Sequence, residues 1–420
     1  MTELTARELL VMLYQTALDA VDGRYLVNQW CNKNNRNKKK PFTHCIAIGK
    51  ASAAMLQGAF DCLPSLNKSL LICPPSKITR QLRKNKNITI LPSSHPVPDE
   101  LSIEAGEALL RFLSAMDKSD ELLFLISGGT SSLVEVPVDS ISLEQLQEIN
   151  QYLLSCGKDI QQVNSWRQQF SKIKGGGLLN WVKMPSITQL LLSDVKDDKA
   201  EFIGSGLLVE SSFSAEPDDY LSTFQVVTKA TIQSERSKET VTKRSNVDTC
   251  IIGNIQLAMQ AVHDAAQGEG LPSYLHDEFL EGDATEAANG LYATLKDAEP
   301  GIHIWGGETT VCLPEKPGIG GRNLTLALAF SQHIVDDKDL HLLAAGTDGC
   351  DGNSNCAGAV VSMFTTQKAG KMGFDTKQEI KKANAGLVLM ATDDLLQGEN
   401  SNTNVMDIVI AYKQAKQRSG

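Results

Sequence analysis

The sequence lacks the features that mark membrane-spanning, zinc-binding and disulfide-rich proteins. No stretch approaches the roughly 20 consecutive apolar residues that span a bilayer. Nine cysteines are scattered along the chain without a Cys-x-x-Cys pair, which excludes the usual zinc motifs. Residues 1–8 carry acids early and lack the charged and then apolar pattern of a signal peptide. We therefore expect a cytoplasmic protein without bound zinc and without contact to a membrane.

Positive charge is also scarce. Lysine and arginine together number 40 against 50 acidic residues, so the formal net charge is -10. A general nucleic-acid binder needs a basic face that can neutralise phosphates. The charge balance therefore predicts that nucleic acid is not a partner.

Three familiar glycine motifs are missing. A P-loop would need glycine five residues before Gly49, where His44 stands. The Gly-x-Ser-x-Gly motif of a serine nucleophile is absent. No Gly-x-Gly-x-x-Gly follows a predicted strand, and residues 318–321 have the wrong spacing for it. Walker-type, hydrolase and dinucleotide sites thus have no support from motifs.

The apolar residues come in short runs that alternate with amphipathic stretches. Such runs stand at 45–48, 122–126, 190–192 and 342–345. Strands of a parallel sheet are buried on both faces, so they are typically short continuous apolar runs separated by helices. With 420 residues and 42% hydrophobic content, the chain can form two packed domains. We predict an α/β fold with two α/β domains.

The predicted elements form two series with a polar connection between them. Predicted helices cover 3–21, 51–60, 102–115, 143–155, 159–171, 254–268, 284–297, 323–335 and a region within 365–394. Predicted strands cover 43–48, 69–73, 88–91, 121–126, 187–192, 302–305, 341–345 and 406–411. Residues 233–246 have little apolar content, so we place one domain at 1–238 and the other at 247–420.

Three glycine-rich turns between residues 306 and 352 are not required by packing. Two follow apolar runs, and the one at 318–323 opens a helical pattern. Ligands of open α/β sheets bind outside the carboxyl ends of the strands. Glycine lets backbone N–H groups approach an anion, while Glu308, Asp348 and Asp351 could hold a metal ion. These turns predict an enzyme that acts on a phosphorylated compound. A glycosidase would also use paired acids, but it would not need these glycines.

The first half of the chain carries similar polar turns. Gly49 and Lys50 join a predicted strand to a helix, where a lysine and a helix N-terminus favour an anion. The alternative is a helix cap with an exposed lysine. Residues 127–132 contain two glycines and four hydroxyls, which suit an anion nest or an ordinary tight turn. Asp194 follows a predicted strand and suits Mg²⁺ or a substrate hydroxyl, whereas His95 is equally a structural or a functional candidate.

Taken together, these segments resemble the glycerate 2-kinase family, whose C-terminal part is known as the MOFRL domain. Ten short motifs carry the resemblance, in family order and over nearly the whole chain. They stand at 48–52, 95–99, 126–132, 163–167, 171–176, 193–195, 306–311, 320–323, 347–352 and 403–405. Each motif alone is weak, whereas ten in order are specific.

The resemblance implies phosphorylation of D-glycerate at its 2-hydroxyl by ATP and Mg²⁺, which gives 2-phosphoglycerate. It implies a first domain that is Rossmann-like with a mainly parallel sheet, a MOFRL region at about 302–412, and an active-site cleft between the domains. The family's key lysine and arginine match Lys50 and Arg322, which would neutralise the phosphoryl group or the glycerate carboxylate.

The other expected site residues fall into three groups. Asp194 joins Lys50 and Arg322 as a catalytic candidate, and Glu308, Asp348 and Asp351 are the metal candidates. The expected substrate- and nucleotide-binding residues are Ser127, Gly128, Gly129, Thr130, Ser131, Asn164, Lys174, Gly307, Asn323, Thr347 and Asn404. The expected partners are D-glycerate and a nucleotide, for a monomer or homodimer.

Two other functions stay open. A hydroxypyruvate reductase, a label that this family has carried, would need a dinucleotide site. A non-catalytic sensor of a phosphorylated hydroxy acid would fit the departures from the family pattern at Gly177, Leu207 and Met406.

Overall fold

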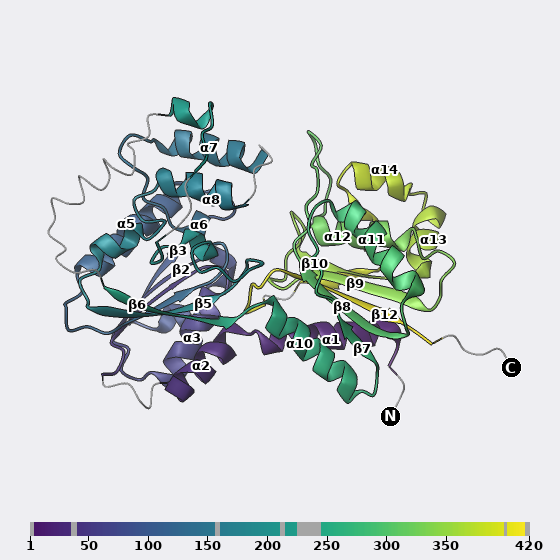
Figure 1. The fold of residues 1–420 in the computed structure, drawn as a ribbon, viewed down its shortest axis with the longest axis horizontal. Helices are drawn as coiled ribbons and strands as arrows, with labels where there is room; N and C mark the ends of the chain where they lie inside the picture. Colours follow the sequence, from purple (N-terminus) through teal and green to yellow (C-terminus); the bar gives the residue numbers. More distant parts are fainter. Residues whose placement is uncertain are drawn as a thin grey trace. The chain divides into compact units, whose positions relative to one another are not determined.

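The computed structural model of the chain describes residues 4–34, 40–155, 160–210, 215–224, 245–398 and 401–415 (Figure 1). They form two compact units. The N-terminal unit is Gly23–Gly253, and the C-terminal unit is Met1–Asp22 with Asn254–Gly420. The predicted connection at 233–246 lies outside the described residues except for its last two positions. No helix among the described residues is both long enough and apolar enough to cross a membrane.

The N-terminal unit contains a six-stranded sheet in the order β3-β2-β1-β4-β5-β6, with parallel pairing throughout. Its strands are β1 (His44–Ile48), β2 (Lys68–Cys73), β3 (Ile88–Pro92), β4 (Leu122–Ile126), β5 (Ser186–Leu192) and β6 (Asn246–Gly253). This is the strand order of a doubly wound, Rossmann-like sheet. The predicted α/β class and mainly parallel first sheet are therefore confirmed.

Helices cover both faces of this sheet (Figure 1). They are α2 (Gly23–Asn34), α3 (Ser52–Cys62), α4 (Arg80–Lys84), α5 (Glu100–Ser114), α6 (Thr130–Leu133), α7 (Leu143–Ser155) and α8 (Ile160–Gln169). Short 3₁₀ turns are η2 (Pro75–Lys77), η3 (Gly177–Trp181), η4 (Ile203–Ser205) and η5 (Leu221–Thr223). Burial on both faces explains the continuous apolar runs in β1, β4 and β5.

The central strands β1 and β4 are neighbours although two other strands separate them in sequence. Their register pairs Ile48 with Ile126, so the turns after both strands begin at the same level. In a doubly wound sheet this switch in strand order opens a crevice outside the carboxyl ends. Residues 49–52 and 127–132 therefore meet at one edge of the sheet.

The C-terminal unit has a mixed sheet in the order β11-β10-β9-β12-β8-β7. Its strands are β7 (Ser273–Leu275), β8 (Gly301–Gly307), β9 (Leu340–Gly346), β10 (Cys356–Val361), β11 (Leu395–Gln397) and β12 (Asp407–Lys413). Only β7 and β8 pair in parallel, and β12 runs antiparallel between β8 and β9. The start of β12 consequently lies beside the ends of β8 and β9.

Helices α1 and α10 pack on one face of this sheet, and α12 packs on the other (Figure 1). The helices of the unit are α1 (Ala6–Ala20), α10 (Ile255–Gly268), α11 (Ala284–Asp297), α12 (Arg322–Ser331), α13 (Met363–Lys371), α14 (Thr376–Lys381) and α15 (Ala385–Ala391). The core between α12 and the sheet contains Trp305, Phe330 and Leu342. The helical region predicted within 365–394 consists of the three short helices α13, α14 and α15.

Helix α1 makes the division of the chain differ from the predicted domains at 1–238 and 247–420. Thr5 caps its N-terminus in a capping box with Glu8. Its apolar face is buried, and its polar groups reach strands of the C-terminal unit. The Arg7 guanidinium donates to the Leu395 carbonyl at 2.9 Å, and the Tyr14 hydroxyl donates to the Gly346 carbonyl at 2.7 Å. Helix α1 therefore belongs to the C-terminal unit.

We expect Tyr14→Phe to destabilise the C-terminal unit by about 1–2 kcal/mol, because the buried Gly346 carbonyl loses a donor. Urea unfolding followed by circular dichroism measures this change. Tyr25→Phe is the matched control, since Tyr25 is 51% exposed, and it should change stability by less than about 0.5 kcal/mol. Equal effects of the two substitutions would contradict the assigned role of Tyr14.

Candidate functional site

The turns after β1 and β4 are bonded to each other. The Lys50 N–H donates to the Gly128 carbonyl at 2.9 Å, and the Ala51 N–H donates to Ser127 Oγ at 3.0 Å. Gly49 has a φ of +127°, and a Cβ there would lie 2.2 Å from Ser127 Oγ. Only glycine fits this crossing. The two predicted anion-binding segments of the N-terminal unit therefore form one rigid polar surface.

Lys50 and His95 flank Gly129 on this surface. Gly129 has a φ of +82°, and a Cβ there would lie 2.9 Å from His95 Cδ2 and 3.2 Å from Lys50 Cγ. The close approach explains why glycine is needed at the start of α6. It also brings His95, which the sequence left undecided between structure and function, beside the predicted catalytic lysine. A lysine side chain and an imidazole close to a helix start are suited to an anion.

Two of the predicted binding hydroxyls serve the turn itself. Thr130 Oγ1 donates to the carbonyls of Ile48 and Ser127, at 3.0 and 2.8 Å. Ser127 Oγ accepts the Ala51 N–H described above. Both side chains are fully buried. They hold the turn in shape, and a ligand at this edge would face the backbone of Gly128 and Gly129 and the partly exposed Ser131.

Asn164 joins this edge through Ser205. The Ser205 hydroxyl lies 2.9 Å from Ser131 Oγ and 3.3 Å from Asn164 Oδ1. Asp194 follows β5, whose register with β4 places it near the same edge of the sheet. Lys50, Ser131, Asn164 and Asp194 are thus gathered by the N-terminal unit.

Lys174 is placed differently from the prediction. Its side chain is 2% exposed, and its ammonium pairs with the Glu135 carboxylate at 2.5 Å. Burial lowers the pKa of Lys174, and Glu135 acts in the opposite direction. A buried ammonium that is held by a buried carboxylate is a structural ion pair. We therefore correct the expectation that Lys174 binds substrate or nucleotide.

The C-terminal unit organises its site around Arg322, the first residue of α12. The guanidinium binds the Asp407 carboxylate through Nε at 2.5 Å and Nη2 at 3.0 Å, while Nη1 lies 3.0 Å from Glu308 Oε1. Burial opposes the charge, but both carboxylates outweigh it and raise the pKa of Arg322. The side chain stays 34% exposed. Arg322 is therefore a permanent, oriented cation with one side open to solvent.

Asp407 is a site residue that sequence reasoning missed. It begins β12, and its Cα is paired with both Gly307 and Gly346. This position lies between the Glu308 and Thr347 turns, and the Asp407 side chain is only 6% exposed. The available signal was an acidic residue at the start of a mostly apolar strand, two residues after the motif at 403–405.

Asp351 is a helix cap and not a free metal ligand. Its Oδ1 accepts the backbone N–H and the Nδ2 of Asn323, at 3.1 and 3.2 Å, and its Oδ2 accepts the Leu324 N–H at 2.9 Å. Asn323 is thereby occupied as well. Burial raises the pKa of Asp351 to about 6, although the hydrogen bonds from Leu324 and Asn323 lower it. The carboxylate accepts N–H groups at the start of α12 that have no partner within the helix.

The remaining predicted residues of this unit hold the turns in place through hydrogen bonds and close packing. Thr347 Oγ1 donates to the Met406 carbonyl at 2.7 Å and accepts the Val405 N–H at 2.8 Å. A Cβ on Gly307 would lie 2.2 Å from the Leu280 carbonyl oxygen, so close packing requires that glycine. Asn404 is buried beside this link. These contacts fix the backbone that would face a ligand.

The three predicted metal ligands have separate partners. Glu308 pairs with Arg322, Asp348 Oδ1 accepts the Cys350 N–H at 3.1 Å, and Asp351 caps α12. Within the described ranges, no group of three or more histidine, cysteine or acidic side chains could hold a metal ion. Mg²⁺ in phosphoryl-transfer sites usually needs only one or two carboxylates beside substrate phosphates and water. The partly exposed Glu308 and Asp348 fit that smaller role, whereas Asp351 does not.

The raised pKa of Asp351 predicts a pH-dependent stability. The folded state keeps this proton up to about pH 6, whereas the ordinary carboxyl loses it near 3.8. The folded state thus binds more protons in this window, and the free energy of unfolding falls as pH rises from about 4 to about 6. Two pK units correspond to about 3 kcal/mol.

We therefore expect the stability of the natural protein relative to Asp351→Asn to fall by up to about 3 kcal/mol between pH 4 and 7. Urea unfolding at several pH values gives this difference. Asp297→Asn, at an 82% exposed side chain, is the control and should show a flat difference. A flat difference for Asp351→Asn would be inconsistent with a buried, proton-binding cap.

Two family models match the chain and cover most of it. Residues 9–244 match the "Domain of unknown function (DUF4147)", and residues 301–407 match the "MOFRL family". The first match alone spans more than half of the 420 residues. Residues 245–300 lie between the two matches.

Several full-length relatives are similar to this chain. A D-glycerate 2-kinase of Thermotoga maritima is 30% identical over 96% of this chain and 97% of its own. A glycerate 2-kinase of Pyrococcus horikoshii is 31% identical over 96% and 94%. A provisionally named hydroxypyruvate reductase of Agrobacterium vitis is 29% identical over 97% and 94%. The crystal structure of the Thermotoga maritima glycerate kinase superposes with a TM-score of 0.80, covering 96% of this chain and 98% of that one.

Proposed function

Because this chain belongs to the glycerate 2-kinase family, a family of phosphotransferases, we propose that it is a cytoplasmic D-glycerate 2-kinase. It transfers the γ-phosphoryl group of ATP, with Mg²⁺, to the 2-hydroxyl of D-glycerate. The products are 2-phosphoglycerate and ADP. The domain assignment that accompanies this proposal is a kinase domain centred on the N-terminal unit and a C-terminal domain with the MOFRL region.

The observation that carries the proposal is the Arg322 cation at the start of α12. Asp407 and Glu308 hold three of its nitrogens, so its orientation is set before a ligand arrives. Phosphoryl transfer is catalysed mainly by positioning and charge stabilisation. A preorganised guanidinium with an exposed side is suited to the negative charge of a transferring phosphoryl group.

We assign further charge stabilisation in this proposal to the β1 and β4 turns. Lys50 would neutralise a phosphate or the glycerate carboxylate, and the backbone of Gly128 and Gly129 would line the same edge. In the transfer, the 2-hydroxyl oxygen bonds to the γ-phosphorus while the bond to ADP breaks. The hydroxyl proton leaves to a carboxylate, for which Asp194 and Glu308 are the candidates. Mg²⁺, when bound through Glu308 or Asp348, would neutralise the phosphate oxygens.

Incubation of the purified protein with ATP, Mg²⁺ and D-glycerate should yield 2-phosphoglycerate, which ³¹P NMR distinguishes from the 3-phosphate. Removal of Mg²⁺ with EDTA should abolish the product, and added Mg²⁺ should restore it. Lys50→Met provides a variant with reduced rate and an intact core, since the lysine stem is not part of the apolar core. No product from D-glycerate or from related hydroxy acids would refute the proposal.

Arg322 can be tested with its charge balance preserved. Removing Arg322 alone would leave Asp407 buried without its cation, which costs roughly 3–5 kcal/mol. The double variant Arg322→Met/Asp407→Asn avoids this and should lower turnover by at least about 10³. Steady-state kinetics and circular dichroism measure rate and fold together.

The pair Arg24→Met/Asp61→Asn is the matched control for this experiment, since Arg24 and Asp61 form an exposed pair at 2.6 Å in the N-terminal unit. It should keep nearly normal turnover. A folded Arg322→Met/Asp407→Asn enzyme with a near-normal rate would remove Arg322 from the mechanism.

The sensor alternative rests partly on Leu207, where the resemblance leads one to expect another residue. Leu207 and Leu208 are 1% and 2% exposed and belong to the core of the N-terminal unit. At this departure the chain therefore has apolar core residues. Binding of D-glycerate and nucleotide without turnover would favour the sensor, and reduction of hydroxypyruvate with a nicotinamide cofactor would favour the reductase.

A further inference from the structure

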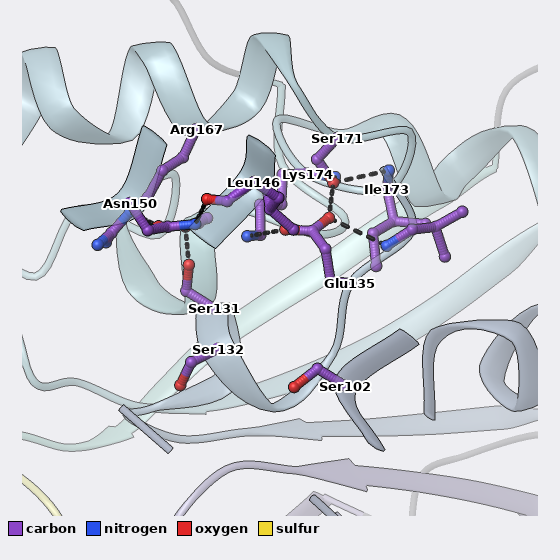
Figure 2. A network of polar contacts seen from close by, with 12 residues as sticks. Ser102, Ser131, Ser132, Glu135, Leu146, Asn150, Arg167, Ser171, Ile173 and Lys174 are labelled. Atoms are coloured by element: carbon purple, nitrogen blue, oxygen red, sulfur yellow. Dashed lines mark hydrogen bonds and ion pairs between the residues drawn. The ribbon is translucent and has the colours of Figure 1, made fainter. Parts of the chain in front are cut away.

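The N-terminal unit contains a buried ionic network beside the β4 turn (Figure 2). Its centre is Glu135, a carboxylate that is 1% exposed. Glu135 Oε2 binds the Lys174 ammonium at 2.5 Å, and Oε1 accepts the Ser171 hydroxyl at 2.5 Å and the Val136 N–H at 3.0 Å. Both oxygens of Glu135 have partners, and Glu135 and Lys174 together carry no net charge.

A second cation, Arg167 of α8, lies in the field of the same carboxylate. Burial lowers the pKa of Arg167, and Glu135 raises it only in part. Arg167 in turn lowers the pKa of Lys174, which means that the two cations repel each other. A guanidinium stays protonated in spite of such effects. Among the described residues, Glu135 is the carboxylate that acts on Arg167, and the same carboxylate is already paired with Lys174.

The direct partner of Arg167 is a neutral group. Its Nε donates to Asn150 Oδ1 at 3.1 Å, and Asn150 is 6% exposed and anchored by its Nδ2 to the Leu146 carbonyl at 2.9 Å. Figure 2 shows Arg167 and Ser131 on either side of Asn150. The hydrogen bond orients the guanidinium through Nε, and the two terminal nitrogens form the fork that matches an oxyanion. Charged groups in such places usually have an opposite charge nearby.

Arg167 lies on the side of α8 that leads to the β4 turn. Asn164 precedes it by three residues and so shares its helix face. Asn164 is linked through Ser205 to Ser131 by the bonds of 3.3 and 2.9 Å. Ser131 belongs to the polar turn that also contains Gly128 and Gly129. The face of α8 that carries Arg167 is therefore connected to the edge where an anionic ligand is expected.

We propose that Arg167 binds an oxyanion of the substrates, either the carboxylate of the hydroxy acid or a phosphate of the nucleotide. This proposal rests on the proposed kinase function and adds a third ligand-binding cation beside Lys50 and Arg322. The ligand would add negative charge next to a guanidinium whose direct partner, Asn150, is neutral. Asn150 is then a positioning residue, which orients the guanidinium without touching the ligand.

Direct binding tests the proposal without the need for turnover. Isothermal titration calorimetry of Arg167→Gln should show a loss of about 10- to 100-fold in affinity for D-glycerate or for a non-hydrolysable ATP analogue, as expected for a charged bidentate contact. Loss for D-glycerate assigns the carboxylate, and loss for the analogue assigns the phosphate. Arg167→Lys keeps the charge but not the fork, and it should recover affinity only in part.

A structural role predicts a different result. If Arg167 only stabilised the fold, Arg167→Gln would unfold at lower urea concentration and keep its ligand affinities. We expect the opposite, with stability of the unliganded protein unchanged or increased because a partly buried cation with a neutral direct partner is removed. Arg111→Gln is the matched control, since Arg111 is 69% exposed on α5 and pairs with Glu107. It should leave both affinities and stability unchanged.

Inorganic phosphate separates failure of this proposal from failure of the kinase assignment. If the natural protein binds neither D-glycerate nor the analogue, the kinase assignment fails, and stabilisation by phosphate then tests Arg167 alone. Stabilisation that Arg167→Gln abolishes supports the site. Equal stabilisation of both proteins, or none of either, overturns it, as do unchanged affinities for both substrates.

Discussion

Most buried polar groups in a folded chain have a hydrogen-bonding partner, and this requirement shapes the polar turns of each unit. Asp351 is buried because it satisfies the first N–H groups of α12, and Asp407 is buried because Arg322 compensates its charge. In the N-terminal unit, the Thr130 hydroxyl donates to the carbonyls of Ile48 and Ser127. Many of the polar residues in the motifs thus build the turns, and fewer of them remain to meet a ligand.

This division of labour clarifies the chemistry. The glycine turns set the backbone, and in the proposed kinase the charge would come from Lys50, Arg322 and Arg167, of which the two arginines are oriented by hydrogen bonds. A buried ion pair contributes little net stability, but it holds a cation in one orientation. Such preorganisation is what phosphoryl transfer requires, since the enzyme mainly positions groups and stabilises charge. Polar networks that add little to stability are therefore reasonable at this site.

Much of the fold could be predicted from local patterns. The apolar runs of β1, β4, β5 and β9 are continuous because both faces of these strands are buried. Strands β6 and β10 were not predicted, and the reasons lie in their local sequences. β6 begins with polar residues at a sheet edge, and β10 is rich in small residues because a Cβ on Gly358 would lie 1.9 Å from the Ala344 carbonyl oxygen. Helix α2 was missed because its sequence is largely polar.

The sequence by itself determined the α/β class, the two series of elements and the residues at which polar turns interrupt apolar strands, because these depend on local periodicity and on glycine. Only the tertiary structure decided which polar residues are engaged in contacts within the protein. The antiparallel placement of β12 brings Asp407 to Arg322, burial pairs Lys174 with Glu135, and α1 joins the far end of the chain. These outcomes depend on contacts between residues far apart in sequence, and such contacts leave no local pattern.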